Sequence, residues 1–222
     1  GTAVFLAVRH GFGRSSGWIF LIIYTLVRII GACLQIATIY DPRNMSLYIG
    51  TAILNTVGLS PLELAALGLL SRSVSSIQNS HSTFLQPHHI KFIQLIVTVG
   101  FILAIVGGVK SSDSVTATGT FATQPLSQAA MGLFIVSYVL LAVSTILAYL
   151  NVSHAEEGER RLVYAVLVSL PFLLVRLVYS SNSIFSNNSD FNSLTVNVTI
   201  FLCMAVIMEH IIVIIYETIG LK

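Results

Sequence analysis

The chain has 222 residues, of which 55% are hydrophobic and only 9% are charged, and its mean hydropathy is +0.87. Soluble domains carry about 25% charged residues, so this composition excludes an ordinary soluble domain and favours a protein whose surface faces lipid. The net charge of +2 is small and not clustered. We therefore expect no nucleic-acid partner.

Apolar stretches long enough to cross a bilayer recur along the chain. A spanning helix needs about 20 largely apolar residues. The sequence predicts the remnant of a first helix at 1–8 and spans at 17–39, 46–70, 91–109, 126–150, 161–180 and 194–218. The predicted fold is all-α. It is a single transmembrane helical domain over 1–222, a polytopic bundle of seven helices with the first one truncated.

The basic residues of the loops predict an orientation. One set of loops and the C-terminus hold Arg9, Arg14, Arg72, Lys91, Arg160, Arg161 and Lys222. The loops on the other side hold only Arg43 and Lys110. Because cytoplasmic loops carry the excess of Lys and Arg, the C-terminus is expected in the cytosol. We expect the protein in the endoplasmic reticulum or another endomembrane.

The cysteine and histidine patterns predict no metal site and no disulfide. Cys33 and Cys203 both lie in apolar runs, so they are interpreted as free thiols in the core. His81, His88 and His89 lack the further ligands and the spacing of a zinc site. Since no phosphate-binding loop or dinucleotide fingerprint is present either, no cofactor is expected.

Ionisable side chains inside the spans are the most informative residues. A charge at the bilayer centre costs about 2.5–3.5 kcal/mol or more. The spans nevertheless contain Arg28, Glu63, Arg176 and Glu209, with His210 beside the last. At a rise of about 1.5 Å per residue, Arg28, Glu63 and Glu209 share one depth and Arg176 lies higher. We expect all four to point into the bundle.

Polar stripes on four spans point to a shared interior site. Residues on one face of a helix recur at three- and four-residue spacings. Each span presents one such stripe, and the stripes are, in chain order, Tyr24, Arg28, Gly31 and Gln35; Thr56, Ser60 and Glu63 with Asn55 nearby; Ser169, Phe172, Arg176 and Tyr179; and Glu209, Tyr216 and Glu217. Two interpretations stay open. The charges form structural ion pairs, Arg28–Glu63 and Arg176–Glu209, or they form a ligand or catalytic site.

Glycines and prolines inside the spans support a close-packed bundle with bends. Gly107 and Gly108 are predicted helix-packing positions, since small residues let helices approach closely. Pro61 and Pro171 each remove a backbone hydrogen bond and bend their helix. Both lie just before a charged residue, so they indicate either a cavity beside that residue or a kink that only improves packing.

Several stretches resemble a family of small fungal seven-helix membrane proteins without an assigned function. They are Arg9-His10-Gly11-Phe12-Gly13-Arg14, Leu26-Val27-Arg28-Ile29-Ile30-Gly31, Leu59-Ser60-Pro61-Leu62, Leu170-Pro171-Phe172 and Met208-Glu209-His210. The spacing of Arg176 and Tyr179 is similar to that in lipid-translocating exporter-like proteins. A more distant analogy is to membrane-bound fungal terpene cyclases, which use intramembrane carboxylic acids to protonate a prenyl chain.

Two functions are compatible with these residues. The first is a terpene cyclase-like enzyme acting on a lipophilic isoprenoid-type substrate. Either Glu63 or Glu209 would be its catalytic acid and the other carboxylate its base, with Glu63 the favoured acid. Its substrate-binding residues would be Arg28, Arg176, Tyr24, Gln35, Asn55, Phe172, Tyr179 and His210. The alternative is a transporter or receptor for a lipid or small molecule with a polar site at mid-membrane depth. Either way, the expected partners are membrane lipid and a lipophilic small molecule. An Arg paired with the proposed acid would count against the enzyme.

Overall fold

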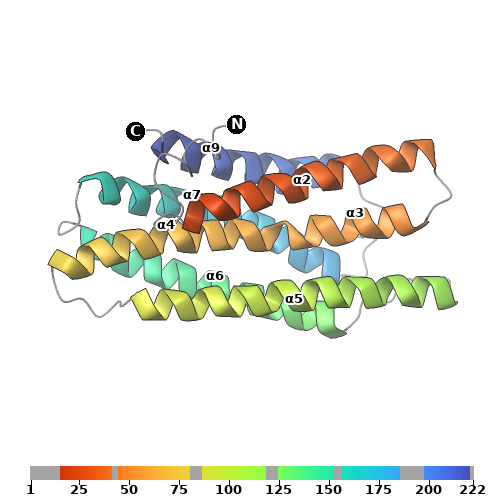
Figure 1. Ribbon diagram of the computed structural model, residues 1–222, viewed down its shortest axis with the longest axis horizontal. Coiled ribbons are helices and arrows are strands. Elements are labelled where there is room, and N and C mark those ends of the chain that lie inside the picture. The colour runs from red at the N-terminus through yellow and green to blue at the C-terminus, as the bar shows by residue number, and fades with distance from the viewer. Residues whose placement is uncertain are drawn as a thin grey trace.

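A computed structural model describes residues 16–41, 45–80, 87–118, 125–152, 157–185 and 198–220. Every secondary-structure element in these ranges is a helix, and Figure 1 shows the long helices running side by side along one axis. The elements are α2 (Ser16–Tyr40), α3 (Met45–Val57), α4 (Leu59–Ser80), α5 (Pro87–Thr118), α6 (Pro125–Leu150), α7 (Glu157–Phe185), α8 (Val198–Phe201), the π-helix η3 (Leu202–Ile207) and α9 (Met208–Gly220).

Six of the described stretches are long and apolar enough to cross a membrane. They are Ile19–Tyr40, Ser46–Gln78, Pro87–Ser111, Pro125–Leu150, Gly158–Phe185 and Thr199–Gly220. These correspond to the six complete spans that the sequence predicts, so the protein is membrane-embedded and all-helical. The helix remnant predicted at 1–8 lies outside the described residues.

The second of these spans forms the centre of the bundle. In an apolar 18-residue stretch of this span, 78% of the residues are buried. In the corresponding stretch of Ile19–Tyr40, only 11% are buried. Figure 1 shows α3 and α4 following one another along the long axis, next to both α2 and α5. Residues 57–70 of this span are buried throughout, so polar groups there must find partners within the bundle.

The central span is broken where the sequence predicts one continuous helix over 46–70. α3 ends at Val57, and α4 begins at Leu59. Pro61 has no backbone N–H and cannot bond the carbonyl of Val57, four residues earlier. The Ser60 hydroxyl donates to that carbonyl instead, at 2.8 Å. The carbonyl left by Pro61 is thus satisfied locally, which favours a packing kink over a cavity at this proline.

Close packing of α5 confirms the prediction for its glycines. A Cβ added at Gly107 would lie 2.5 Å from the Ser127 hydroxyl oxygen on α6. One added at Gly108 would lie 2.6 Å from the Ile53 side chain on α3. Neither distance is compatible with a side chain, so these positions set how closely α5 approaches both neighbours.

Large apolar side chains cover the outside of the bundle. Exposed examples lie on α2, α5 and α6, among them Leu26, Ile30, Phe92, Ile102, Val136 and Val139. Such a surface fits contact with lipid tails. Cys33 and Cys203 are free, as predicted, but both are exposed, so their placement in the core is wrong. In a membrane protein, an apolar run does not distinguish a core position from a lipid-facing one.

Candidate functional site

Glu209 on α9 is the centre of a buried polar network. Its side chain is fully buried, yet three donors from two other helices reach its carboxylate. The Tyr24 hydroxyl donates to Oε2 at 2.7 Å, and Arg28 Nη2 donates to the same oxygen. Arg176 Nε on α7 donates to Oε1 at 2.5 Å. Two guanidinium groups compensate the buried charge, so Glu209 is a structural anion.

Arg176 is held entirely by protein groups. Its side chain is 1% exposed. Besides Glu209, it donates from Nη1 to the Ser180 hydroxyl and from Nη2 to the backbone carbonyl of Asn55, at 2.5 Å for the latter. The guanidinium carbon also lies 5.7 Å from the centre of the Tyr179 ring. Arg176 therefore joins α7 to α3 and α9 and has no surface of its own to offer a ligand.

Arg28 differs because it is partly open. Its Nη1 donates to the Asn55 side-chain oxygen at 3.0 Å, and its Nη2 pairs with Glu209. The side chain nevertheless retains 21% exposure, against 1% for its partner. Its guanidinium carbon lies 5.8 Å from the centre of the Tyr24 ring. One face of Arg28 is thus fixed by the network, and the other faces a cavity.

This cavity has a volume of about 560 Å³ and lies between α2, α3 and the last span. Its polar wall holds Tyr24, Thr25, Arg28, Gln35, Asn55, His210 and Glu217. Its remaining wall is apolar or small and holds Val27, Ile29, Gly31, Ala32, Leu54, Phe201, Val206 and Val213. Ligand pockets of about 300–1,000 Å³ with mainly apolar walls and a few polar groups are typical of small-molecule sites.

The cavity is elongated along the helices. From Tyr24 to Gln35 along α2 is about 16 Å at the rise of an α-helix. The opposite wall, between Val206 and Glu217, covers a similar length. α2 packs on α3 and α4, and α9 packs on α7, which leaves the cavity as a groove between α2 and α9. This shape suits a chain that lies parallel to the helices.

A π-helix precedes Glu209 in the last span. η3 covers Leu202–Ile207 and is followed directly by α9. π-helical turns are rare and occur frequently at functional sites. Here the wide turn changes the angular register of the span, and both Phe201 before it and His210 after it line the cavity. His210 folds back on its own helix, with Nδ1 2.8 Å from the carbonyl of Val206.

Glu63 on α4 lies in a different environment. It is 1% exposed, and its Oε2 accepts a hydrogen bond from the Ser137 hydroxyl on α6 at 2.7 Å. Its other oxygen has no hydrogen-bond partner, and within the described ranges no Lys or Arg forms an ion pair with it. An isolated buried carboxylate is so costly that such groups neutralise instead. Glu63 is best described as a neutral acid in a closed core.

The predicted ion pairs are therefore half right. Arg176 pairs with Glu209, but Arg28 also pairs with Glu209 and not with Glu63. Glu63 on α4 meets Ser137 of α6, whereas Asn55 on α3 reaches both arginines. The prediction that all four charged residues lie within the bundle is confirmed, with Arg28 the least buried.

The structure places the other predicted site residues in two groups. Tyr24, Arg28, Gln35, Asn55 and His210 all line the cavity. Arg176, Tyr179, Phe172 and the two glutamates do not belong to its wall. Phe172 packs against the apolar core on α7, and Tyr179 lies beside Phe201 with ring centres 6.0 Å apart. The predicted roles of these residues in binding or catalysis remain predictions.

Sequence reasoning missed several partners. Ser180 follows Arg176 by four residues, a spacing that predicts contact on one helix face. Thr25 also lines the cavity and was visible as a polar residue within a span, whereas Glu217 belongs to the stripe predicted on the last span. Ser137 on α6 gave no signal, because a lone serine in an apolar span is common.

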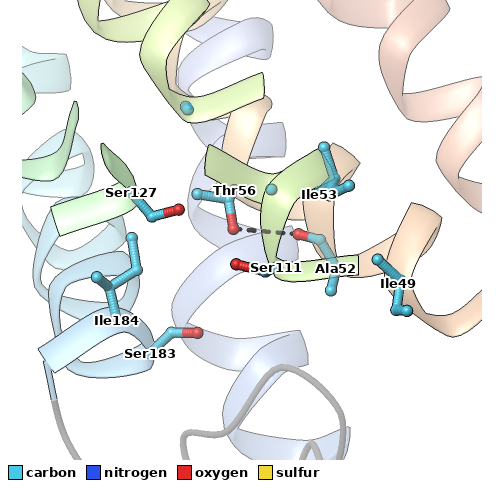
Figure 2. A pocket seen from close by; sticks show the side chains of 10 residues that line it. Ile49, Ala52, Ile53, Thr56, Ser111, Ser127, Ser183 and Ile184 are labelled. Carbon is cyan, nitrogen blue, oxygen red and sulfur yellow. Dashed lines mark hydrogen bonds between the residues drawn. The ribbon is translucent and has the colours of Figure 1, made fainter. Parts of the chain in front are cut away.

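A second, smaller cavity lies where α5 ends and α6 begins. Its volume is about 50 Å³, and Figure 2 shows the hydroxyls of Thr56, Ser111, Ser127 and Ser183 pointing into the same space from four helices. Thr56 donates to the carbonyl of Ala52 at 3.1 Å, and Ser111 donates to that of Gly107 at 2.9 Å. A cavity needs roughly 10–15 Å³ to hold one water molecule. The space suits a few waters and is too small for a lipophilic ligand.

The whole chain, residues 1–222, matches the family described as Domain of unknown function (DUF7702), and the protein belongs to that family. No curated protein and no solved structure matches the chain. The expectation of a family without an assigned function is thus confirmed. The fungal origin and the analogies to terpene cyclases and exporters remain predictions, and the function must be argued from the site itself.

Proposed function

We propose that the protein binds a lipophilic small molecule or membrane lipid in the groove between α2 and α9, and acts as a receptor or transporter for it. The observation that carries this proposal is the cavity of about 560 Å³ with Arg28 in its wall. A polar group at mid-membrane depth is expensive unless it serves a function. Here it lies beside apolar walls long enough for an acyl or prenyl chain.

The polar and apolar walls together favour an amphipathic ligand. The tail would lie along Ile29, Val206 and Val213, while the head would reach Arg28, Tyr24 and Asn55. The network around Glu209 holds these head-group contacts in place before any ligand arrives. Preorganised contacts of this kind reduce the entropy cost of binding.

The experiment that tests this proposal is mass spectrometry of lipids that co-purify with the protein. In the Ala32→Trp variant, an indole ring is placed in the wall of the groove to obstruct it, because Ala32 lies in that wall. The matched control is Val139→Trp, at an exposed position on α6 away from the groove. We expect a specific lipophilic compound with the wild type and the control, and its loss with Ala32→Trp. Identical lipid profiles from all three proteins would refute the proposal.

A second candidate function is the terpene cyclase-like enzyme, and Glu63 is the observation that favours it. A neutral buried acid is the group that such proton-transfer chemistry needs. Two features weigh against it. Glu63 is not in the wall of the groove, although a catalytic acid must come within about 2.6–3.2 Å of the reacting atom. Glu209 pairs with two arginines, and an arginine paired with the proposed acid counts against the enzyme.

The enzyme is tested with Glu63→Gln, which keeps the shape of the side chain but cannot transfer a proton. If the protein cyclises a prenylated substrate, this variant should lose about 10²–10⁴-fold of its turnover. The matched control is Ser137→Ala, which keeps the acid and removes its hydrogen bond. Full turnover by the Gln variant would exclude Glu63 as the acid.

We also propose that the C-terminus lies in the cytosol and that the protein resides in the endoplasmic reticulum or another endomembrane. The asymmetry of Lys and Arg between the two sets of loops supports this orientation. His88, exposed at the start of α5, then lies on the cytosolic side. In the Cys33→Ser, Cys203→Ser background, His88→Cys in sealed microsomes should react with an impermeant thiol reagent from the cytosolic side. Protection until the membrane is opened would reverse the orientation.

A further inference from the structure

Resting on the proposed binding function, we infer that the ligand carries an anionic head group, a carboxylate or a phosphate, that binds to Arg28. The shared chemistry is a negatively charged group with at least two oxygens. This assignment follows from the charges of the network, the hydrogen bonds of Arg28 and the position of the other charged group in the cavity wall.

The network has one positive charge in excess. It contains the guanidinium groups of Arg28 and Arg176 and the carboxylate of Glu209. The other groups that touch it, Tyr24, Asn55 and Ser180, are neutral hydrogen-bonding groups. A surplus cation at mid-membrane depth is unfavourable without a counter-charge. An anion in the groove would complete the pairing.

Arg28 is the arginine that presents the excess positive charge to the groove. Arg176 is enclosed, and each of its three nitrogens has a partner. In the described part of the chain, Arg28 uses two donors, for Asn55 and Glu209. A guanidinium carries five N–H groups in a fixed fork. The remaining N–H groups of this partly exposed side chain can therefore serve a ligand, and the planar fork matches carboxylate and phosphate oxygens.

The remaining charged group in the wall does not oppose this placement. Glu217 lies eight residues after Glu209 on α9, about 12 Å further along the helix. Thr25, Gln35 and His210 are the other polar wall residues outside the network, and the first two are neutral donors and acceptors. An anionic head at Arg28 is thus separated from the Glu217 carboxylate by about two turns of helix.

The test is a head-group series with one tail. Myristic acid, myristyl phosphate, myristyl alcohol and myristylamine are titrated against the purified full chain in a non-ionic detergent, with binding measured by calorimetry. We expect at least one of the two anions to bind about tenfold or more tightly than the alcohol, and the amine to bind weakest. Inorganic phosphate without a tail serves as a competitor. Competition by it would assign recognition to the head alone, and no competition would require the tail as well.

Two variants locate the effect. In Arg28→Gln the preference for the anion over the alcohol should fall to about twofold or less, while Glu209 keeps Arg176 as its counter-ion. Arg28→Lys keeps the charge and should retain part of the preference. If Arg28→Gln does not fold, the wild-type series alone decides. Equal binding of anion and alcohol, or tightest binding of the amine, would overturn the inference and leave the binding function standing. Binding of none of the four would contradict the proposed function itself.

Discussion

Two buried carboxylates in this bundle have opposite surroundings. Glu209 accepts hydrogen bonds from two arginines and a tyrosine at the edge of an open groove. Glu63 has one serine for a partner in a closed core between α4 and α6. Both are buried, and the sequence makes both of them candidates for a catalytic acid. The difference shows that burial alone does not assign a role, because the neighbours decide whether a carboxylate is charged.

Substituting Glu209 should have the largest effect. Glu209→Gln removes the negative charge and leaves two buried guanidinium groups without it. Breaking a buried ion pair by removing one partner typically costs about 3–5 kcal/mol. We expect poor recovery of folded protein and a strongly lowered midpoint of thermal unfolding. Size-exclusion chromatography after heating to a series of temperatures measures this midpoint. A midpoint equal to that of the wild type would show that Glu209 is not the anchor of the network.

The tight contact between α5 and α3 and the wall of the groove should also respond differently to an added methyl group. Gly108→Ala would place a Cβ 2.6 Å from Ile53, whereas the nearest atom to a Cβ at Gly31, in the wall of the groove, is 3.7 Å away. Overpacking costs typically about 1–3 kcal/mol. We expect Gly108→Ala to lower the unfolding midpoint and Gly31→Ala to leave it unchanged or raise it, since Ala is the better helix former. The reverse order would mean that the groove is as tightly packed as the core.

Glu63→Gln should have the smallest effect on stability. The amide is neutral, like the protonated acid, and it keeps an oxygen for the Ser137 hydroxyl. The expected change in unfolding free energy is within about 1 kcal/mol, the scale of one net hydrogen bond. The two Gln variants are purified side by side and melted in the same detergent. A loss of unfolding free energy as large as that for Glu209→Gln would contradict a neutral Glu63 and show that it is ionised and paired.

The spans were predictable because the bilayer imposes a length on apolar segments. The stripe of Tyr24, Arg28 and Gln35 was predictable for a similar reason, since helical periodicity places these residues on one face. All three line the groove. Local pattern thus identified the α2 wall of the site without any knowledge of the fold.

The partners of Glu63 and Glu209 were not predictable from spacing. Periodicity assigns a residue to a face of its helix but does not say which neighbour that face meets. The break after Val57 precedes Glu63, and the π-helix over Leu202–Ile207 precedes Glu209. Both interruptions depart from the 3.6-residue period on which the sequence argument depends. The predicted burial of Cys33 and Cys203 was wrong for a different reason, because lipid and core are equally apolar.

The most direct measurement of the central claim is photo-crosslinking from inside the groove. A photoreactive amino acid replaces Ala32 in the groove wall or Val139 on the outer face of α6, and the protein is irradiated in its native membrane. Mass spectrometry then identifies the lipids attached at each position. The account predicts that the Ala32 position captures one class of anionic lipophilic molecule and that the Val139 position captures the bulk lipids of the membrane. The same adducts at both positions would contradict it, because the groove would then be ordinary lipid-facing surface.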